Sequence, residues 1–416
     1  MEMKVSVKKR NILMFFLLLP LLETSYIANN WDTIHQIIAL LKYGSIAVAF
    51  ILYISDKDFM TKPTKPAIFI IVYSLIVIVS SLLNGGELIT AVMESLQLIA
   101  TIFLGDLIIK NSLKDYISVV YPIFFLMATI NFITMVLYPN GMYSRVMEGS
   151  YVWVSRNNWF LGLENAMTAY LIPALALTYI NMLIKRTRFS YLTALVMSVM
   201  CMYVPIVRHK GSMLVCFLLF IMLCLLAYWK ILPSILNART YLIFNVLFFV
   251  AIVLLSSANT GIVAIIEAFF SRNTLSVRTV IWGKVLDLIP QKLILGYGYE
   301  AAHIVSDKLK YDSAHNQYLW ILYRGGIAQF LVFGKFILDS VNSLYKKRAF
   351  AVVKIISASF FVLLLMWQTE SITNNVLMLF LLFVYYVGIR GDELFLGERE
   401  FDYKKVFKYR IRTKGN

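Results

Sequence analysis

The sequence has few charged residues and few cysteines for its length. Only 15% of its 416 residues are charged and 60% are hydrophobic, whereas about a quarter of the residues of a soluble domain are charged. This composition excludes a soluble protein. Apolar runs of about 17–25 residues, the length that crosses a bilayer, recur along the whole chain. We therefore expect an integral membrane protein.

The scarcity of cysteine excludes a disulfide framework. All three cysteines, Cys201, Cys216 and Cys224, lie inside apolar runs, where a thiol is expected to be buried rather than paired. No spacing of cysteine and histidine resembles a set of zinc ligands. The sequence also contains no internal repeat and no segment of low complexity.

The apolar runs predict an all-α, polytopic membrane protein with about twelve transmembrane helices. The first run, at 12–22, follows a basic segment and resembles a secretory signal. Because Glu23 comes directly after it and no small-residue cleavage site is present, we expect it to be retained as a helix. The other predicted spans lie at 34–54, 67–83, 88–109, 117–138, 162–183, 190–206, 212–229, 240–257, 318–342, 351–367 and 372–390.

These spans divide the chain into four parts. Residues 1–257 hold the first nine helices, an outer loop at 139–161 and a basic turn at 207–211. Residues 258–317 form a long outer loop, 318–390 hold the last three helices, and 391–416 form a basic tail. Both termini then lie in the cytoplasm with most of the 39 Lys and Arg residues, as the positive-inside rule requires. The tail alternates basic and aromatic residues, which fits contact with anionic membrane lipid.

The net charge of +16 is explained by this orientation and predicts no nucleic-acid partner. The cations on the outer side oppose the positive-inside bias and therefore mark candidate sites. Arg208, His209 and Lys210 crowd a short turn between two spans, which indicates a site for an anion. Glu164 and Asn165 lie where the chain re-enters the membrane, and this polar pair is either functional or a helix cap.

The stretch 258–326 is the one long segment that is neither uniformly apolar nor a short charged connector. Within it, Ser276–Ile289 has helical spacing of apolar residues and ends at Pro290, so it predicts a short amphipathic helix. Arg278 and Trp282 lie four residues apart on this helix. A planar fork of donors beside a flat indole fits a phosphorylated sugar, but both residues also fit anchoring at the lipid interface.

His315 and Asn316 follow in the same stretch, at the outer start of the next span. A histidine in such a place can serve as a general base near neutral pH, or it can be a hydrogen-bonded structural residue. Gly296-Tyr297-Gly298 predicts a tight turn, although it falls far short of a phosphate-binding loop.

Taken together, these segments resemble the O-antigen polymerase/ligase superfamily, in particular the Wzy-type polymerases of capsular and exopolysaccharide repeat units. In place of the Ser-Arg pair usual in the basic turn of the family, Lys210 precedes Gly211-Ser212 and Arg208 lies two residues earlier, so either can take the role of the family arginine. Four segments carry the resemblance: FLGLENAMTAYLIPAL at 160–175, VRHKGS at 207–212, SVRTVIWGKVLDLIPQKLILGYGY at 276–299 and SAHNQYLWILYRGGI at 313–327.

The resemblance implies transfer of a glycan from an undecaprenyl diphosphate carrier to a sugar hydroxyl on the outer face of the bacterial cytoplasmic membrane. No cofactor or metal is expected, because the outer loops lack an Asp-x-Asp pair and cations can stabilise the leaving diphosphate. His315 would take the acceptor proton or hold a phosphate oxygen. A chain-length regulator and a flippase of the same pathway are the implied protein partners. The implied catalytic residues are Arg278, His315, Arg208 and Lys210, and the implied substrate-binding residues are Arg272, Arg156, Glu164, Asn165, Trp282, Tyr297, Asn316 and Arg324.

Two other functions remain open from the sequence. A ligase of the same superfamily would share these motifs and make a single transfer to a different acceptor. A flippase or transporter for lipid-linked sugar is also commonly built from about twelve helices, but it would show internal repeats and charges lining a central cavity within the spans. Here the predicted spans are nearly free of charge, and the outward cations lie on one face of the membrane.

Overall fold

The computed structural model describes residues 7–146, 155–227, 235–254, 274–372 and 374–394. Within these ranges the chain is helical apart from connecting loops and one small hairpin. Seven helical segments are long and apolar enough to cross a membrane, and shorter apolar helices accompany them. The all-α polytopic fold is therefore confirmed. Each of the twelve predicted spans overlaps a described helix, and residues 228–229, 255–257 and 373 of these spans lie outside the described residues.

The longer spanning helices are α3 (Asp32–Ser55), α5 (Lys65–Leu83), α6 (Leu88–Ile109), α7 (Leu113–Leu137), α8 (Thr168–Lys185, preceded by the 3-10 turn η2 at Glu164–Met167), α9 (Arg188–Val207) and α16 (Gln317–Lys346). The shorter apolar helices are α1 (Val7–Leu18, continued by η1 at Leu19–Leu22), α10 (Gly211–Ala227), α11 (Ala238–Phe248, continued by a π-helix at Phe249–Leu254), α17 (Ala351–Met366) and α18 (Asn375–Arg390). Further short elements are α2 (Ser25–Asn30), α4 (Lys57–Thr61), α14 (Thr274–Leu288), η4 (Ile289–Lys292), α15 (Ala302–Leu309) and η5 (Gly391–Leu394).

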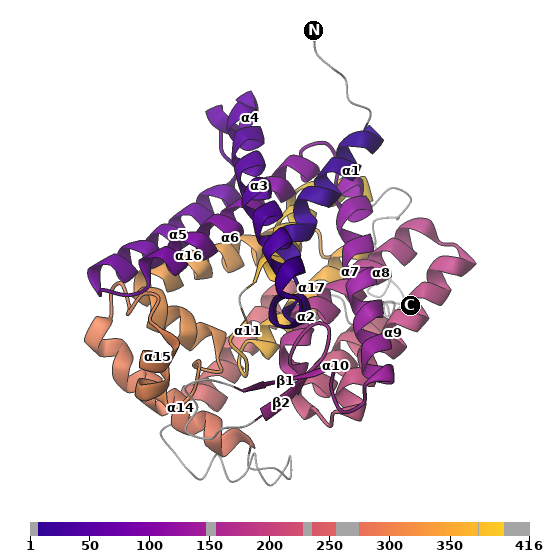
Figure 1. Ribbon diagram of the computed structural model, residues 1–416. Coiled ribbons are helices and arrows are strands. Elements are labelled where there is room, and N and C mark those ends of the chain that lie inside the picture. The colour runs from indigo at the N-terminus through magenta and orange to yellow at the C-terminus, as the bar shows by residue number, and fades with distance from the viewer. Residues whose placement is uncertain (1–6, 147–154, 228–234, 255–273, 373, 395–416) are drawn as a thin grey trace, which may run out of the picture.

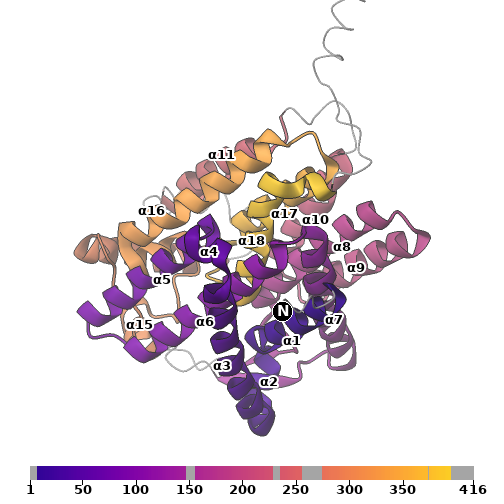
Figure 2. The same ribbon diagram turned by 90° about the horizontal axis from the view of Figure 1, so that it is seen from above.

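Two helices form the centre of the bundle. Most residues of α17 and α18 are buried, because α16, α8, α10 and α11 surround α17 while α16, α6, α7 and α8 surround α18 (Figure 2). The outer helix α3 instead exposes large apolar side chains such as Leu40 and Ile51. Exposed apolar faces of this kind are expected where a helix meets lipid.

One end of the bundle gathers the loops that connect distant helices. The hairpin of β1 (Tyr143–Val146) and β2 (Ser155–Asn158) is antiparallel and lies on the same side as α14 and α15, whereas α4 lies at the opposite end (Figure 1). The loop at 139–161 thus contains a short hairpin that the apolar periodicity did not predict. The expected amphipathic helix of the long loop is present as α14.

The long loop has a core of its own beside the start of α16. Ile281, Trp282 and Val285 of α14 pack there with Trp320 and Tyr323 of α16. Two glycines allow this docking. At Gly298, where φ is +77°, a Cβ would lie 2.5 Å from the backbone of Ser81; at Gly326, where φ is +61°, it would lie 2.3 Å from the carbonyl oxygen of Ile294. Only glycine tolerates both the positive φ and the close approach.

The kink at Gly326 frees backbone carbonyls of α16 to accept hydrogen bonds from the loop. The amide of Tyr297 donates to the Tyr323 carbonyl oxygen at 2.8 Å, and the amide of Gly298 donates to that of Arg324 at 2.8 Å. The sequence Gly296-Tyr297-Gly298, expected to be a tight turn, therefore fastens the loop to the break in α16.

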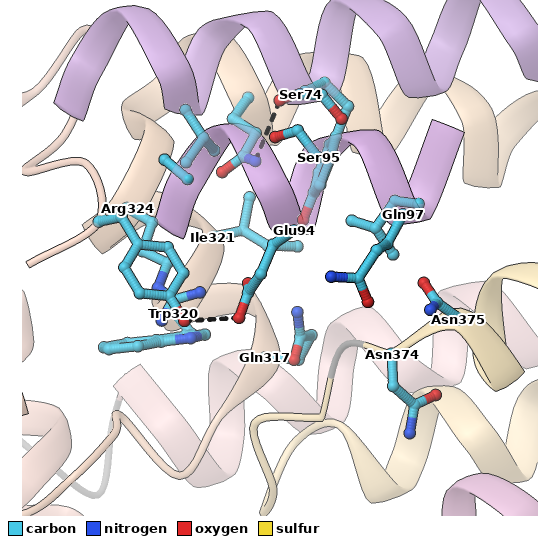
Figure 3. A pocket seen from close by; sticks show the side chains of 16 residues that line it. Ser74, Glu94, Ser95, Gln97, Gln317, Trp320, Ile321, Arg324, Asn374 and Asn375 are labelled. Carbon is cyan, nitrogen blue, oxygen red and sulfur yellow. Dashed lines mark hydrogen bonds between the residues drawn. The ribbon is translucent and has the colours of Figure 1, made fainter. Parts of the chain in front are cut away.

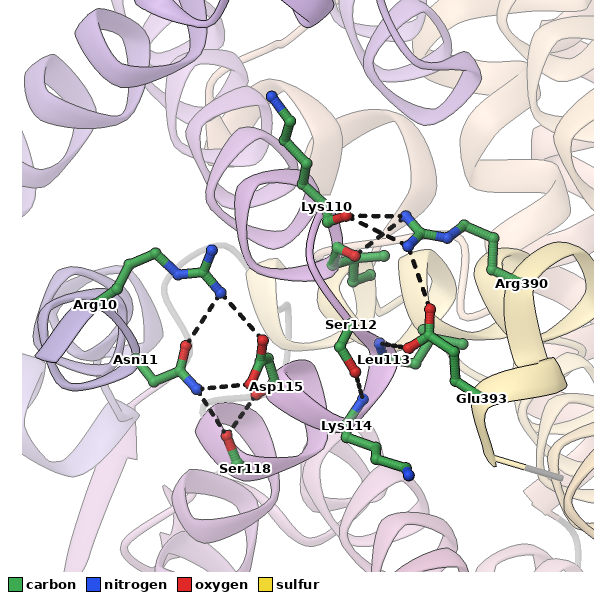
Figure 4. Close-up of polar contacts among 11 residues, drawn as sticks. Arg10, Asn11, Lys110, Ser112, Leu113, Lys114, Asp115, Ser118, Arg390 and Glu393 are labelled. Carbon is green, nitrogen blue, oxygen red and sulfur yellow. Dashed lines mark hydrogen bonds and ion pairs between the residues drawn. The ribbon is translucent and has the colours of Figure 1, made fainter. Parts of the chain in front are cut away.

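Polar contacts at the end of the bundle away from this loop join α1, α7 and α18 (Figure 4). Arg10 Nη2 lies 3.2 Å from Asp115 Oδ2. Arg390, the last residue of α18, donates to the carbonyl oxygen of Ile109 at 3.2 Å and pairs with Glu393 at 3.3 Å. These contacts hold the ends of helices that are distant in sequence.

Candidate active site

Two buried carboxylates organise the polar side chains near the loops. Glu164 begins η2, just before α8, and Glu370 lies in the short connection between α17 and α18. Glu164 is only 5% exposed to solvent and Glu370 only 6%. A carboxylate that leaves water is unfavourable unless cations and hydrogen-bond donors replace the solvent. The groups that surround Glu164 and Glu370 therefore identify the site.

Glu370 receives groups from three distant segments. Arg278 of α14 places Nη2 2.5 Å from Glu370 Oε1. Asn165, at the start of η2, donates from Nδ2 to the same oxygen at 2.6 Å. The other carboxylate oxygen lies 3.7 Å from Nδ1 of His315. Three side chains, from segments up to 205 positions away along the chain, thus meet around the carboxylate of Glu370.

Glu164 receives both cations of the basic turn between α9 and α10. Arg208 Nε lies 3.0 Å from Glu164 Oε1, and Lys210 Nζ lies 3.8 Å from Glu164 Oε2. The guanidinium of Arg208 also lies over the ring of Trp159, 4.7 Å from its centroid, and this contact restrains its orientation. Because Glu164 and Asn165 are consecutive, the two carboxylate groups belong to one polar network.

His315 occupies a backbone conformation that side chains seldom adopt. Its φ is +45°, in the left-handed region that costs a residue other than glycine about 1 kcal/mol or more. The ring is held between Glu370 and Asp312, whose Oδ1 lies 3.6 Å from Nε2. Both separations exceed a normal hydrogen bond, and 23% of the His315 side chain is exposed.

The composition of this network suits an anionic ligand. Three cations, Arg208, Lys210 and Arg278, surround two buried carboxylates, with His315 beside them. Asn165 Oδ1 is buried and has no hydrogen-bond partner within the part of the chain that the structure describes. Arginine and lysine held beside a histidine offer donors to phosphate oxygens and a group that can move a proton.

The structure thus brings together six of the expected site residues: Arg278, His315, Arg208, Lys210, Glu164 and Asn165. Two other expected residues cannot be placed in the network. Arg272 lies outside the described residues. Only the backbone of Arg156 is described, and it pairs with Arg145 in the hairpin.

Three further candidates have structural contacts in place of contacts with the network. Trp282 is completely buried in the core beneath the long loop, so its indole packs inward and does not share an outer surface with Arg278. Tyr297 stacks on Tyr323 with centroids 4.8 Å apart. Asn316 caps α16 by accepting from the Leu319 amide at 3.0 Å. Their roles in binding substrate remain predictions.

Arg324 lies beside a cavity near the network. Its guanidinium lies 4.2 Å from the ring centroid of Tyr299 and 4.5 Å from that of Trp320, and these residues line the cavity with Arg324. Sequence reasoning missed Glu370, which the structure places at the centre of the network. The signal is the polar run WQTESITNN at 367–375, which connects two strongly apolar helices and carries one carboxylate.

No group of three or more metal-ligating side chains occurs among the residues that the structure describes. The three cysteines are free and buried. The polar side chains of the network are cations, carboxylates, an amide and one imidazole.

A comparison with protein families extends this description. No curated protein matches the chain. A family model described as O-antigen ligase matches residues 171–334, a range that contains Arg208, Lys210, Arg278 and His315 but neither of the two buried carboxylates. The resemblance to the O-antigen polymerase/ligase superfamily is therefore confirmed over residues 171–334, and this part of the membrane protein is similar to glycan-transferring enzymes.

Proposed function

We propose that the protein is a polysaccharide repeat-unit polymerase. In this proposal it joins oligosaccharide units carried on undecaprenyl diphosphate, on the outer face of the bacterial cytoplasmic membrane, with both termini in the cytoplasm. The observation that carries the proposal is the convergence of Arg278, His315 and the Arg208/Lys210 turn on two buried carboxylates. The match to the O-antigen ligase family supports glycan transfer as the reaction class.

The reaction places a demand on the site that these residues meet. An acceptor hydroxyl oxygen attacks the anomeric carbon of the donor sugar, a new carbon–oxygen bond forms, and the bond from that carbon to the diphosphate breaks. Negative charge then accumulates on the leaving diphosphate. Cations that are already oriented stabilise this charge without rearrangement, which is the role we assign to Arg278 and to the Arg208/Lys210 turn.

The proton of the acceptor hydroxyl needs a base near the same place. We assign this role to His315, because its ring lies beside Glu370, with Nδ1 3.7 Å from a carboxylate oxygen, and its side chain is partly exposed. Glu370 would then position two groups at once, the imidazole of His315 and the guanidinium of Arg278. When the diphosphate binds, its oxygens compete with Glu370 for Arg278. No step in this scheme uses a metal ion.

Two alternatives differ from this proposal in their products. An O-antigen ligase would make one transfer of finished glycan to a different acceptor, whereas a polymerase produces a ladder of lengths on the carrier lipid. A flippase for lipid-linked oligosaccharide would move the substrate without joining units. The cluster of cations beside a histidine favours transfer over transport, because transport does not require a base.

The test is a glycan ladder from cells that carry the wild-type chain, Arg278→Ala or His315→Ala, with the amount of each protein in the membrane measured by immunoblot. We expect both variants to be present and to leave only single repeat units on the carrier. Long polymer in both variants would contradict the assigned site. A single ligated product from the wild type would establish the ligase. Single units retained inside the cells that carry the variants would establish the transporter.

A further inference from the structure

A cavity of about 230 Å³ lies among α5, α6, α16 and the connection to α18. It adjoins the polar network along the chain, because Gln317 in its wall follows His315 by two residues and Asn374 follows Glu370 by four. Drug-sized ligands occupy pockets of about 300–1,000 Å³. A cavity slightly below that range suits a smaller ligand, of the size of one sugar ring.

The polar groups of the cavity are mostly neutral. Amide side chains line it at Gln97, Gln317 and Asn374, and hydroxyls line it at Ser74 and Ser95. Figure 3 shows Glu94 and Gln97 directed from α6 toward Gln317 and Asn374 on the opposite wall. An amide offers both a donor and an acceptor, and so does a sugar hydroxyl. The walls are therefore complementary to a ligand rich in hydroxyl groups.

The two charged groups of the cavity are already engaged by protein. Tyr299 donates its hydroxyl to Glu94 Oε1 at 2.6 Å, and burial raises the pKa of Tyr299 to about 12, so this donor stays protonated at physiological pH. The guanidinium of Arg324 lies over the rings of Tyr299 and Trp320. One carboxylate and one guanidinium leave no excess charge, unlike the network around Glu164 and Glu370.

Unsatisfied polar atoms provide a second and independent indication of a ligand. Ser74 and Gln329, each 2% exposed, line the cavity. Ser74 Oγ and Gln329 Oε1 have no hydrogen-bond partner among the described residues. Buried polar atoms are nearly always paired in folded proteins, so these two atoms are expected to find partners on a ligand or on water that a ligand displaces.

The geometry points to a subsite for a neutral sugar ring of the lipid-linked glycan in this cavity, beside the cations that bind its diphosphate. This inference rests on the proposed function and extends it. It assigns the recognition of sugar hydroxyls in part to Ser74, Ser95 and Gln97, which lie on α5 and α6, before the segment 171–334 that matches the O-antigen ligase family. Binding of diphosphate and binding of sugar are thereby divided between two adjoining places.

The first experiment measures access to the cavity in membrane vesicles that contain the full chain. Q97C places a thiol in the wall, and T90C places one on the same helix outside the cavity; the three native cysteines are buried and provide a quiet background. The reagent is N-ethylmaleimide. Three ligands are tested for protection against this labelling: the lipid-linked oligosaccharide from cells lacking this chain, the same oligosaccharide released from the lipid, and undecaprenyl diphosphate alone.

We expect both forms of the oligosaccharide to protect Q97C and leave T90C unchanged. At a concentration of about four times the Kd, the rate of labelling should fall about fivefold, by the factor 1 + [L]/Kd. Undecaprenyl diphosphate alone should give no protection. Protection by the diphosphate lipid without its sugar, or no protection by either oligosaccharide, would overturn the subsite.

The second experiment separates this inference from the proposed function. Q97L keeps the size of the side chain and removes its hydrogen bonds, so the KM for the lipid-linked oligosaccharide should rise about three- to tenfold with little change in kcat. Thr90→Val is the matched control. If Arg278→Ala abolishes polymer while Q97L behaves as wild type, the subsite is wrong and the polymerase stands. If the wild-type chain itself yields a single ligated product and no ladder, the proposed function is wrong, whereas an intact ladder in Arg278→Ala contradicts only the assigned role of Arg278.

Discussion

The two ends of α18 hold ion pairs of the same chemical kind in different surroundings. Beside its start, the side chain of Glu370 is 8% exposed and faces Arg278, Asn165 and His315. At its other end, the side chain of Glu393 is 34% exposed and pairs with Arg390, which also donates to backbone carbonyls. A helix of 16 residues, about 24 Å long, separates the two pairs.

The difference concerns what each cation can still do. Arg390 and Arg10 bind carboxylates and carbonyls that belong to the fold, and they join α18 and α1 to the α6–α7 connection and α7. Arg278 instead meets a buried carboxylate that two other side chains share. Such a carboxylate can exchange partners when an anion arrives. We therefore expect the pairs of Arg390 and Arg10 to serve stability, and the contacts of Arg278 with Glu370 to serve the proposed function.

The largest effect expected from this comparison is that of Arg278→Ala. Removing one oriented donor to a developing negative charge lowers kcat by about 10²–10³-fold, and the purified variant in nanodiscs should show this loss with lipid-linked oligosaccharide as substrate. Arg278→Lys should restore only part of the rate, because an ammonium group lacks the planar fork. An unchanged kcat in Arg278→Ala would mean that Arg278, like Arg390 and Arg10, has only a structural role.

Glu370→Gln tests whether the buried carboxylate positions the groups around it. The amide keeps the size of the side chain and loses its charge, so His315 and Arg278 are held less firmly and kcat should fall about 30-fold, within the ~10²-fold loss that a 1 Å misplacement causes. The KM should not rise, because the diphosphate no longer competes with a carboxylate for Arg278. A raised KM at normal kcat would show that Glu370 binds substrate directly.

The sequence predicted the helices and most residues of this candidate site for different reasons. A bilayer imposes the length of each span locally, so hydropathy predicted spans that overlap the long apolar helices of the described residues. The motifs located Arg208, Lys210, Arg278 and His315, which the structure gathers. The pairing of Arg278 with Glu370 spans 92 residues and depends on how α14 packs against the α17–α18 connection, which no local pattern records.

Trp282 shows the same limit on a smaller scale. The spacing of apolar residues predicted its helix, and α14 is present. Whether the indole faces the membrane surface or the protein depends on partners such as Tyr323 and Leu309, which come from other segments and bury it completely. Periodicity identifies a helix and its apolar stripe, and only the packing of the loop decides which side chains remain accessible.

Arg208→Ala and Lys210→Ala sharpen the comparison within the network itself. Arg208 lies 3.0 Å from Glu164 and over the Trp159 ring, whereas Lys210 lies 3.8 Å from Glu164. We expect Arg208→Ala to lower both kcat and the apparent Tm in detergent, because it leaves a buried carboxylate with one distant partner. Lys210→Ala should lower kcat about tenfold at an unchanged Tm. The reverse pattern would assign the structural role to Lys210.

The smallest effect on activity is expected from Arg390→Ala, at the end of α18 away from the site. Its carboxylate partner is a third exposed, and ion pairs at such positions contribute about 0–1 kcal/mol, but the loss of its bonds to the Ile109 and Lys110 carbonyls should still lower the apparent Tm. Activity at a temperature well below that Tm should stay within about twofold of wild type, because the substitution lowers stability but removes no contact with the transition state. Arg10→Ala, at the same end, is the matched control. If either variant abolished polymer while remaining folded, Arg390 and Arg10 would not be purely structural, and the contrast between the two ends of α18 would be wrong.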